Sequence, residues 1–291
     1  MHPTREDVRL QDQFASNSYI QIGPARIHVE IKPEAARSSC IELYMPFVHG
    51  FIAPNANTVD CSISLEVDDN YPHRSDLLEP LIERRDDGNF DVKWQNIQGN
   101  YNPFRRHFRG VSANNPSPLN AALRILTYFI GASRGILLLH AAGFVCPDGT
   151  AYVFSGHSGV GKTTIAQDAI KRFPSGKLLS DELLVITHEH GSNSSSVLGT
   201  PFWGTLELPG IPSSMPLRKL FFLKQSNLDR ITALSPAQAL SCLGKNVVAY
   251  WKSPDILKPM LATMTACAQS VTAYELCFRR ELTFWRLLGY Q

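Results

Sequence analysis

The sequence of 291 residues carries little net charge and few cysteines. Its formal net charge of +2 is too small to predict a nucleic acid or a membrane surface as a partner. No two cysteines form a Cys-x-x-Cys pair, so a zinc site of the usual spacing is not expected, and buried free thiols are predicted instead. The six cysteines are Cys40, Cys61, Cys146, Cys242, Cys267 and Cys277.

Long apolar segments are also missing. Met1–Ser16 is polar and charged, without the apolar core that a secretion signal needs. The longest apolar stretches, such as Leu119–Ile130 and Gly135–Cys146, are too short or too interrupted to span a membrane. These absences predict a soluble, cytoplasmic protein that has neither a membrane nor a nucleic acid as its partner.

The composition is otherwise that of a globular protein. Hydrophobic residues make up 44% of the chain and charged residues 19%, which is enough for a packed core. Alternating apolar residues in Ala25–Ile31 and Cys61–Val67 predict a strand-rich first part. The polar, proline-containing stretch Ser112–Pro118 indicates a boundary. We therefore expect one domain over residues 1–112 and a second over residues 113–291.

The second domain begins with a predicted helix and then a predicted hairpin. Ile136–Cys146 and Thr150–Ser155 read as strands, and Pro147–Gly149 between them reads as a tight turn. Two strands joined by so short a turn must be antiparallel. A purely parallel sheet is therefore not expected around the segment that follows.

That segment is glycine-rich and matches the phosphate-loop pattern G-x-x-x-x-G-K-[ST]. Its glycines let successive backbone N–H groups point at one phosphate, and the N-terminus of the helix predicted over Thr163–Arg172 adds positive potential. Lys162 would reach the β- and γ-phosphates, and the Thr163 hydroxyl would bind Mg²⁺. The predicted nucleotide site consists of Gly156, His157, Ser158, Gly159, Val160, Gly161, Lys162, Thr163 and Thr164.

Two adjacent carboxylates, Asp181 and Glu182, follow one predicted helix after the loop. Beside a triphosphate, one carboxylate can hold Mg²⁺ and the other can accept the proton of an attacking hydroxyl. The sequence leaves open which acid takes which role, and a solvated acidic turn is the alternative. The guanine-reading N-K-x-D element and the H-R-D and D-F-G elements of protein kinases are missing, so neither a GTPase switch nor a protein-kinase fold is expected.

Four segments together resemble the catalytic domain of the HPr kinase/phosphorylase family: Leu139–Gly143, the phosphate loop, Leu178–Glu182 and Leu206–Ile211. The resemblance implies an α/β fold of the phosphoenolpyruvate-carboxykinase-like kinase type, a mixed sheet with flanking helices. It also implies ATP and Mg²⁺ as cofactors and transfer of phosphate to a serine hydroxyl. The implied catalytic residues are Asp181, Glu182, His140 and Lys162, and the implied metal ligands are Thr163, Asp181, Glu182 and Glu207.

Several positions depart from the family pattern. His157 and Thr164 stand where the family has acids, Glu182 where it has an aspartate, and Pro209 where it has an arginine. The segment containing Pro209 serves the reverse, dephosphorylating reaction in that family, so that activity is not expected here. The chain resembles more closely the HPr-kinase-related serine kinases found beside peptide-modification systems, which include lasso-peptide precursor kinases.

This narrower resemblance implies a peptide or protein acceptor with a serine or threonine hydroxyl, which residues 1–112 would recognise. The family also forms rings, which leaves open a homo-oligomer. Two other functions remain open at this point. The chain could be an ATP-binding scaffold or regulator without chemistry, or a kinase of a small metabolite such as free serine.

Overall fold

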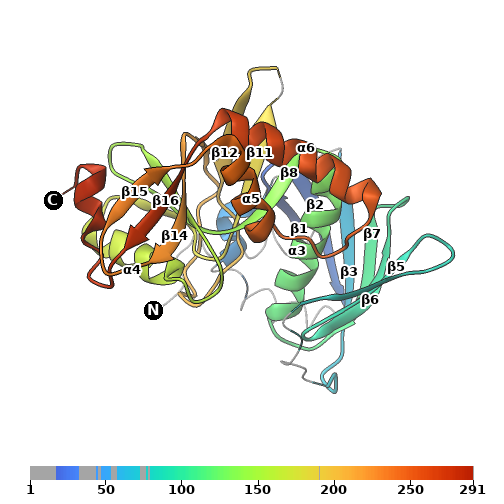
Figure 1. Ribbon diagram of the computed structural model, residues 1–291. Helices are drawn as coiled ribbons and strands as arrows, with labels where there is room; N and C mark the ends of the chain where they lie inside the picture. Colours follow the sequence, from blue (N-terminus) through green and yellow to red (C-terminus); the bar gives the residue numbers. More distant parts are fainter. Residues whose placement is uncertain are drawn as a thin grey trace, which may run out of the picture. The chain divides into compact units, whose positions relative to one another are not determined.

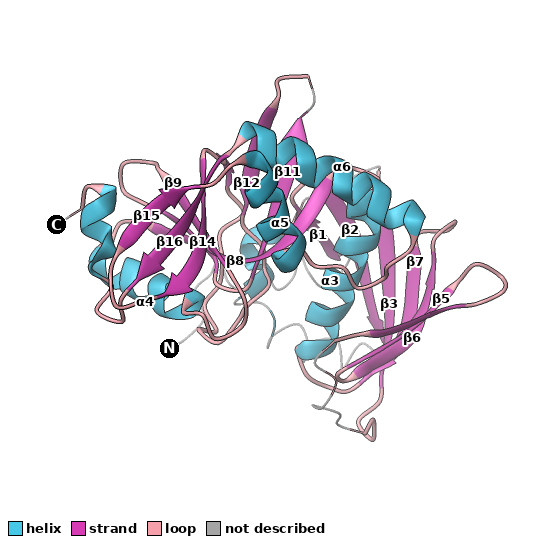
Figure 2. Cartoon of the chain, in the orientation of Figure 1, coloured by secondary structure: helices cyan, strands magenta, loops and turns pink. Residues whose placement is uncertain are grey.

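The computed structural model describes residues 18–32, 44, 47–53, 58–72, 77, 79–189 and 191–290. The chain divides into two compact units, Met1–Ile130 and Gly131–Gln291 (Figure 1). Both contain mixed sheets and helices (Figure 2), so the predicted α/β class is confirmed. The predictions for Met1–Ser16 and Cys40 lie outside the described residues.

The first unit is built on a seven-stranded mixed sheet in the order β1-β2-β3-β7-β6-β5-β4. The alternation predicted for Ala25–Ile31 is confirmed, because Ile27, Val29 and Ile31 are all buried on one face. Its strands and its short 3-10 helix are β1 (Ser18–Ile22), β2 (Ala25–Lys32), η1 (His49–Phe51), β3 (Cys61–Val67), β4 (Leu81–Arg84), β5 (Phe90–Trp94), β6 (Ile97–Asn102) and β7 (His107–Ser112).

Helix α3 (Ser117–Ala132) begins at the end of the polar stretch Ser112–Pro118, which predicts the domain boundary. Its Phe129 ring lies 5.0 Å from the Phe90 ring of β5 and 4.8 Å from the Tyr101 ring of β6. Because the helix packs on the first sheet, the contacts of the chain divide at Ile130/Gly131 and not at the polar stretch before the helix.

The second unit is built on a nine-stranded sheet in the order β13-β12-β11-β8-β9-β14-β16-β15, with β10 paired to β8 beside this path. The predicted hairpin is confirmed: β8 and β9 are antiparallel, and Ala141 faces Ser155. Beyond β9, strands β14 and β16 run parallel to it. The strands are β8 (Ile136–Val145), β9 (Ala151–Ser155), β10 (Lys177–Ser180), β11 (Leu183–Glu189), β12 (Ser194–Leu198), β13 (Ser214–Pro216), β14 (Lys219–Gln225), β15 (Arg230–Ala233) and β16 (Thr272–Phe278).

The helices of this unit include the one predicted over Thr163–Arg172, which is confirmed. They are α4 (Lys162–Arg172), α5 (Pro236–Asn246), α6 (Pro254–Ser270) and the 3-10 helix η2 (Thr283–Leu288). Helix α5 begins with a capping box, in which Ser235 and Gln238 satisfy each other's backbone N–H groups. A buried aromatic cluster that includes Phe154, Phe284 and Trp285 joins β9, η2 and α4. This cluster fixes the strand that leads into the phosphate loop.

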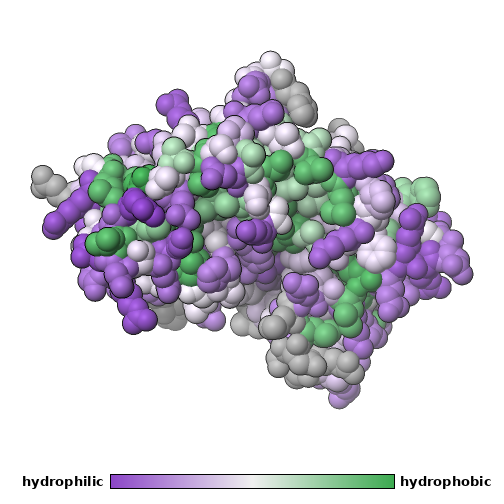
Figure 3. Space-filling model, in the orientation of Figure 1, coloured by the Kyte–Doolittle hydropathy of each residue, from purple (hydrophilic) through white to green (hydrophobic). Residues whose placement is uncertain are grey.

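The surface of each unit carries scattered apolar side chains among hydrophilic ones (Figure 3). In the second unit the exposed large apolar residues are Leu208, Leu228, Leu257, Leu261 and Leu287. Single exposed leucines of this kind are normal for a folded domain. Within the part of the chain that the structure describes, no helix combines the length and the apolar character needed to cross a membrane.

Candidate nucleotide and phosphoryl-transfer site

The phosphate loop connects the end of β9 to the first turn of α4. Gly159 and Gly161 have φ angles of 78° and 114°, a region that L side chains rarely adopt. A Cβ atom at Gly161 would also lie 3.0 Å from Cζ of Phe278. Both glycines are therefore required by the shape of the loop. The phosphate-loop pattern predicts this for Gly161, whereas Gly159 stands at one of its variable positions.

Two residues hold the loop against the sheet. Val160 is 2% exposed and packs in the aromatic cluster. The Gln225 side-chain amide at the end of β14 donates to the backbone oxygens of Gly159 (3.4 Å) and Val160 (3.3 Å). The apolar packing of Val160 and the amide of Gln225 thus both hold the loop in place.

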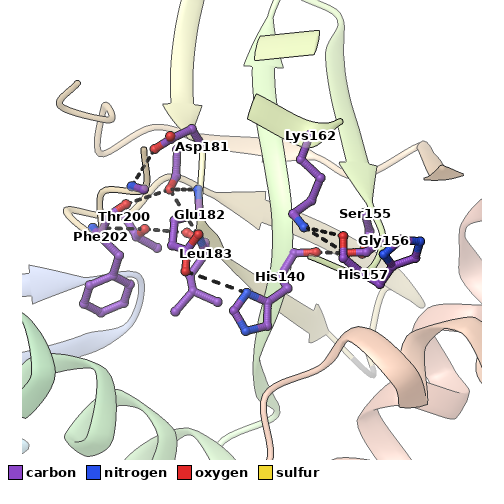
Figure 4. Close-up of polar contacts among 12 residues, drawn as sticks. His140, Ser155, Gly156, His157, Lys162, Asp181, Glu182, Leu183, Thr200 and Phe202 are labelled. Carbon is purple, nitrogen blue, oxygen red and sulfur yellow. Dashed lines mark hydrogen bonds and ion pairs between the residues drawn. The ribbon is translucent and has the colours of Figure 1, made fainter. Parts of the chain in front are cut away.

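Lys162 folds back over the beginning of the loop (Figure 4). Its Nζ donates to the carbonyl oxygens of Gly156 at 2.8 Å and His157 at 3.1 Å. Burial lowers the pKa of Lys162, and the charge of the Glu182 carboxylate opposes that shift. Thr163 follows in the first turn of α4 and is half-buried, and Thr164 is exposed. The ammonium therefore marks the end of the loop that faces Glu182.

Strand β8 lies between the phosphate loop and the acidic pair. On one side, Ser155 at the end of β9 donates its hydroxyl to the His140 carbonyl oxygen at 2.8 Å. On the other side, β10 pairs with the second half of β8 and β11 with its first half, so Leu183 faces His140. The register of β10 against β8 shifts between Leu178 and Ser180, just before the two acids. Asp181 and Glu182 follow as a bend between β10 and β11. Adjacent side chains of an extended segment point to opposite faces, so a bend is needed only where two adjacent acids are to serve one site.

The two acids have different environments. Glu182 is partly exposed, and its Oε1 lies 4.0 Å from Nδ1 of His140 (Figure 4). Asp181 is 1% exposed, and its oxygens accept the backbone N–H groups of Gly204 (2.8 Å) and Leu206 (3.0 Å). Of the two predicted catalytic acids, only Glu182 is open towards His140 and Lys162, whereas Asp181 is enclosed as the anchor of a turn.

The turn that Asp181 anchors carries the predicted carboxylate Glu207. Glu207 is exposed and has a φ angle of 50°, which is uncommon for a residue with a side chain. Its neighbour Leu206 packs against Ala142 of β8, Ala166 of α4 and Leu178 of β10. Because Ala166 lies one turn after Thr163, this packing brings the turn to the helix that begins at the phosphate loop.

The donor set suits Mg²⁺ bound together with a nucleotide. Among the described residues, no group of three or more His, Cys, Asp or Glu side chains is placed to hold a metal ion. Mg²⁺ beside a triphosphate usually takes one or two carboxylates, phosphate oxygens and waters, so it does not require such a group. Thr163, Glu182 and Glu207 offer oxygens of this kind, and Asp181 has its oxygens directed to backbone amides.

Two residues that support the site were not anticipated from the sequence. Ser180 donates its hydroxyl to the Phe202 carbonyl oxygen and accepts the N–H groups of Glu182 and Leu183. Gln225 holds the loop from a strand far along the chain. The Ser-Asp-Glu sequence is a local turn signal that could have indicated Ser180, but no local pattern indicates Gln225.

The comparisons with known proteins locate this chain in one family. None of the curated proteins matches it. A model of the family described as "SynChlorMet cassette protein ScmC" matches residues 118–276, which is more than half of the 291-residue chain. The match spans the hairpin, the phosphate loop, the acidic pair and the turn with Glu207. The chain therefore belongs to the ScmC family of SynChlorMet cassette proteins.

Proposed function

We propose that this protein is an ATP-dependent kinase that transfers the γ-phosphoryl group to a serine or threonine hydroxyl of a peptide or protein. The observation that carries the proposal is the arrangement around β8. The phosphate loop with Lys162 lies on one side of that strand, and Glu182 lies on the other, 4.0 Å from His140. A phosphate-binding loop with a carboxylate open towards its lysine is what transfer to a hydroxyl requires.

In the proposed reaction the acceptor hydroxyl oxygen forms a bond to the γ-phosphorus of ATP. The bond from that phosphorus to the β,γ-bridging oxygen breaks, ADP leaves, and the hydroxyl proton passes to Glu182. His140 positions the Glu182 carboxylate, and Lys162 stabilises the charge on the transferred group. Most of the rate enhancement then comes from positioning and electrostatic stabilisation.

Mg²⁺ would neutralise charge on the β- and γ-phosphates when it is bound. Thr163 would hold it from the first turn of α4, and Glu207 from the neighbouring turn. Asp181 would act as a positioning residue, because its carboxylate fixes the backbone just before Glu207. In this proposal Glu182 is the proton acceptor and Asp181 anchors the turn.

The acceptor would approach the end of the loop that Lys162 covers. A hollow of about 510 Å³ opens beside Gly156 and His157. Its walls include the apolar residues Val160, Phe222, Leu223 and Leu234 as well as the charged residues Lys224, Lys245 and Glu275. Charged residues of both signs beside an apolar wall suit a peptide that carries both polar and apolar side chains. The size alone also admits a small metabolite, so free serine belongs in the test.

The test is transfer of label from γ-labelled ATP with Mg²⁺ to short peptides encoded beside the gene and to free serine, followed by mass spectrometry. Glu182→Gln should lower transfer by about 10²- to 10⁴-fold, the usual contribution of a general base, while ATP still binds. Glu189→Gln, the same change at the exposed end of β11, should leave transfer unchanged.

Three other outcomes would each point elsewhere. Undiminished transfer by Glu182→Gln would rule out Glu182 as the proton acceptor. Label on free serine alone would make the protein a metabolite kinase. Tight ATP binding with no transfer to any acceptor would favour a nucleotide-binding regulator.

A further inference from the structure

A second hollow adjoins the end of the phosphate loop, at Gly161 and Thr164. It encloses about 980 Å³. The helix side of the loop contributes Gly161 and Thr164. The remaining walls come from the ends of β14 and β16 and the segments that follow them. None of the residues in the remaining walls takes part in the proposed transfer step. Their residues are Gln225, Ser226, Asn227, Phe278, Arg279, Arg280, Glu281 and Leu282.

The topology of the sheet places this hollow where ligands of parallel strands bind. Strands β9, β14 and β16 are parallel neighbours in that order. Their carboxyl ends meet at one edge, and the phosphate loop leaves from the end of β9. Ligands of α/β sheets bind in the crevice outside these carboxyl ends. A nucleotide held by its phosphates at β9 therefore has β14 and β16 beside it.

The direction of the triphosphate follows from Lys162. Lysine of a phosphate loop reaches the β- and γ-phosphates, and here its Nζ lies over Gly156 and His157, facing Glu182. The γ-phosphate therefore lies at the beginning of the loop. The nucleoside must leave from the other end, where Gly161 and Thr164 line the hollow.

The walls of the hollow carry groups that suit a nucleoside. Asn227 has an amide that offers a donor and an acceptor side by side, the pattern that pairs with a purine edge. The Asp229 carboxylate accepts two hydrogen bonds from Arg279, one from its backbone N–H at 2.8 Å and one from its guanidinium at 3.5 Å. Its neighbour Arg280 is exposed and makes no ion pair among the described residues. One arginine thus fixes the segment and the other remains available to a ligand.

We infer that this hollow binds the base and ribose of the nucleoside triphosphate, with Asn227 and Arg280 as its recognition residues. The inference rests on the proposed function for the position of the phosphates. The protein would then recognise the nucleoside as well as the triphosphate. Gln225 connects the two parts, because it lines the hollow and also holds the loop at Gly159 and Val160.

The test compares two ligands by calorimetry on the full-length protein with Mg²⁺: ATP, and inorganic tripolyphosphate, which fills the phosphate loop alone. The unmodified protein should bind ATP more tightly than tripolyphosphate. Arg280→Ala and Asn227→Ala should each weaken ATP binding about 10-fold, the effect of losing one strong hydrogen bond, and leave tripolyphosphate binding unchanged. Arg286→Ala, an exposed arginine on η2 outside the hollow, is the matched control.

The outcomes separate this inference from the kinase proposal. Equal affinity for ATP and tripolyphosphate, with both variants unchanged, would overturn the inference and leave phosphoryl transfer intact. Loss of both ligands in Arg280→Ala would also overturn it, because the arginine would then serve the phosphates. If the unmodified protein bound neither ligand, the proposed function itself would fail and the inference with it.

Discussion

The two adjacent acids illustrate how strongly the role of a residue depends on its neighbours. Asp181 directs both oxygens to backbone N–H groups, so Asp181→Asn turns an amide NH₂ towards a donor and leaves that donor unsatisfied. We expect this variant to lose about 1–3 kcal/mol of unfolding free energy. Glu182 is partly exposed, so Glu182→Gln should cost less stability than Asp181→Asn.

Chemical denaturation of the two variants measures this difference. Transfer activity should fall in both, because Asp181→Asn releases the turn before Glu207 and Glu182→Gln removes the proton acceptor. Equal stability of both variants would show that the Asp181 carboxylate does not anchor the turn.

We expect the buried charge of Lys162, which serves to bind phosphate, to destabilise the folded chain. Its pKa is lowered by burial from the ordinary value of 10.5, so the charged form is disfavoured in the folded chain. Between the folded and the unfolded pKa the unfolded chain binds more protons, so stability rises with pH in that window. Without nucleotide, Lys162→Met should therefore melt above the unmodified protein at pH 7.

The sign of the pH dependence provides the check. The melting advantage of Lys162→Met should shrink as the pH rises towards 10.5, because the native lysine then loses its proton. Lys171→Met, on the exposed face of the same helix, should show no such trend. A constant advantage at every pH would mean that the charge of Lys162 is not its source.

At the scale of elements, the turn that carries Glu207 is seated against β10 by a glycine. A Cβ atom at Gly210 would clash with the backbone oxygens of Leu179 and Thr200, the latter at 2.6 Å. Gly210→Ala should push this segment off the strand, at a cost of about 1–3 kcal/mol, and should reduce transfer. Gly191→Ala, where a Cβ would meet nothing within 4 Å, is the control for denaturation and activity assays. Unchanged transfer in a destabilised Gly210→Ala variant would show that the position of this turn does not matter for phosphoryl transfer.

At the scale of the whole molecule, the nucleotide should stabilise the folded chain by binding it and not the unfolded chain. At 100 times its dissociation constant, ATP with Mg²⁺ should add about 2.7 kcal/mol to the unfolding free energy. All the residues of the phosphate loop belong to the second unit, so the transition of that unit should move. Scanning calorimetry with and without nucleotide measures the shift, which Lys162→Met should abolish. A shift that persists in Lys162→Met would place the nucleotide elsewhere.

Local patterns in the sequence determined the elements of this protein. The alternation of Ala25–Ile31, the turn Pro147–Gly149 and the glycines of the phosphate loop each encode their own backbone, because period, turn geometry and positive φ depend on nearby residues. The antiparallel hairpin before the loop followed from the turn length alone. For the same reason the predicted strands and helices lie within a few residues of those in the structure.

Tertiary structure decided which residues meet. Helix α3 joined the first unit because Phe129 found partners on β5 and β6. The local sequence does not distinguish the roles of Asp181 and Glu182. The packing of the turn at Gly204–Leu206 makes Asp181 the anchor of that turn and leaves Glu182 partly exposed. Gln225 reached the phosphate loop, and Arg280 the hollow beside it, through parallel strands far apart in the chain. Such long-range pairings depend on the whole sheet, so no local pattern contains them.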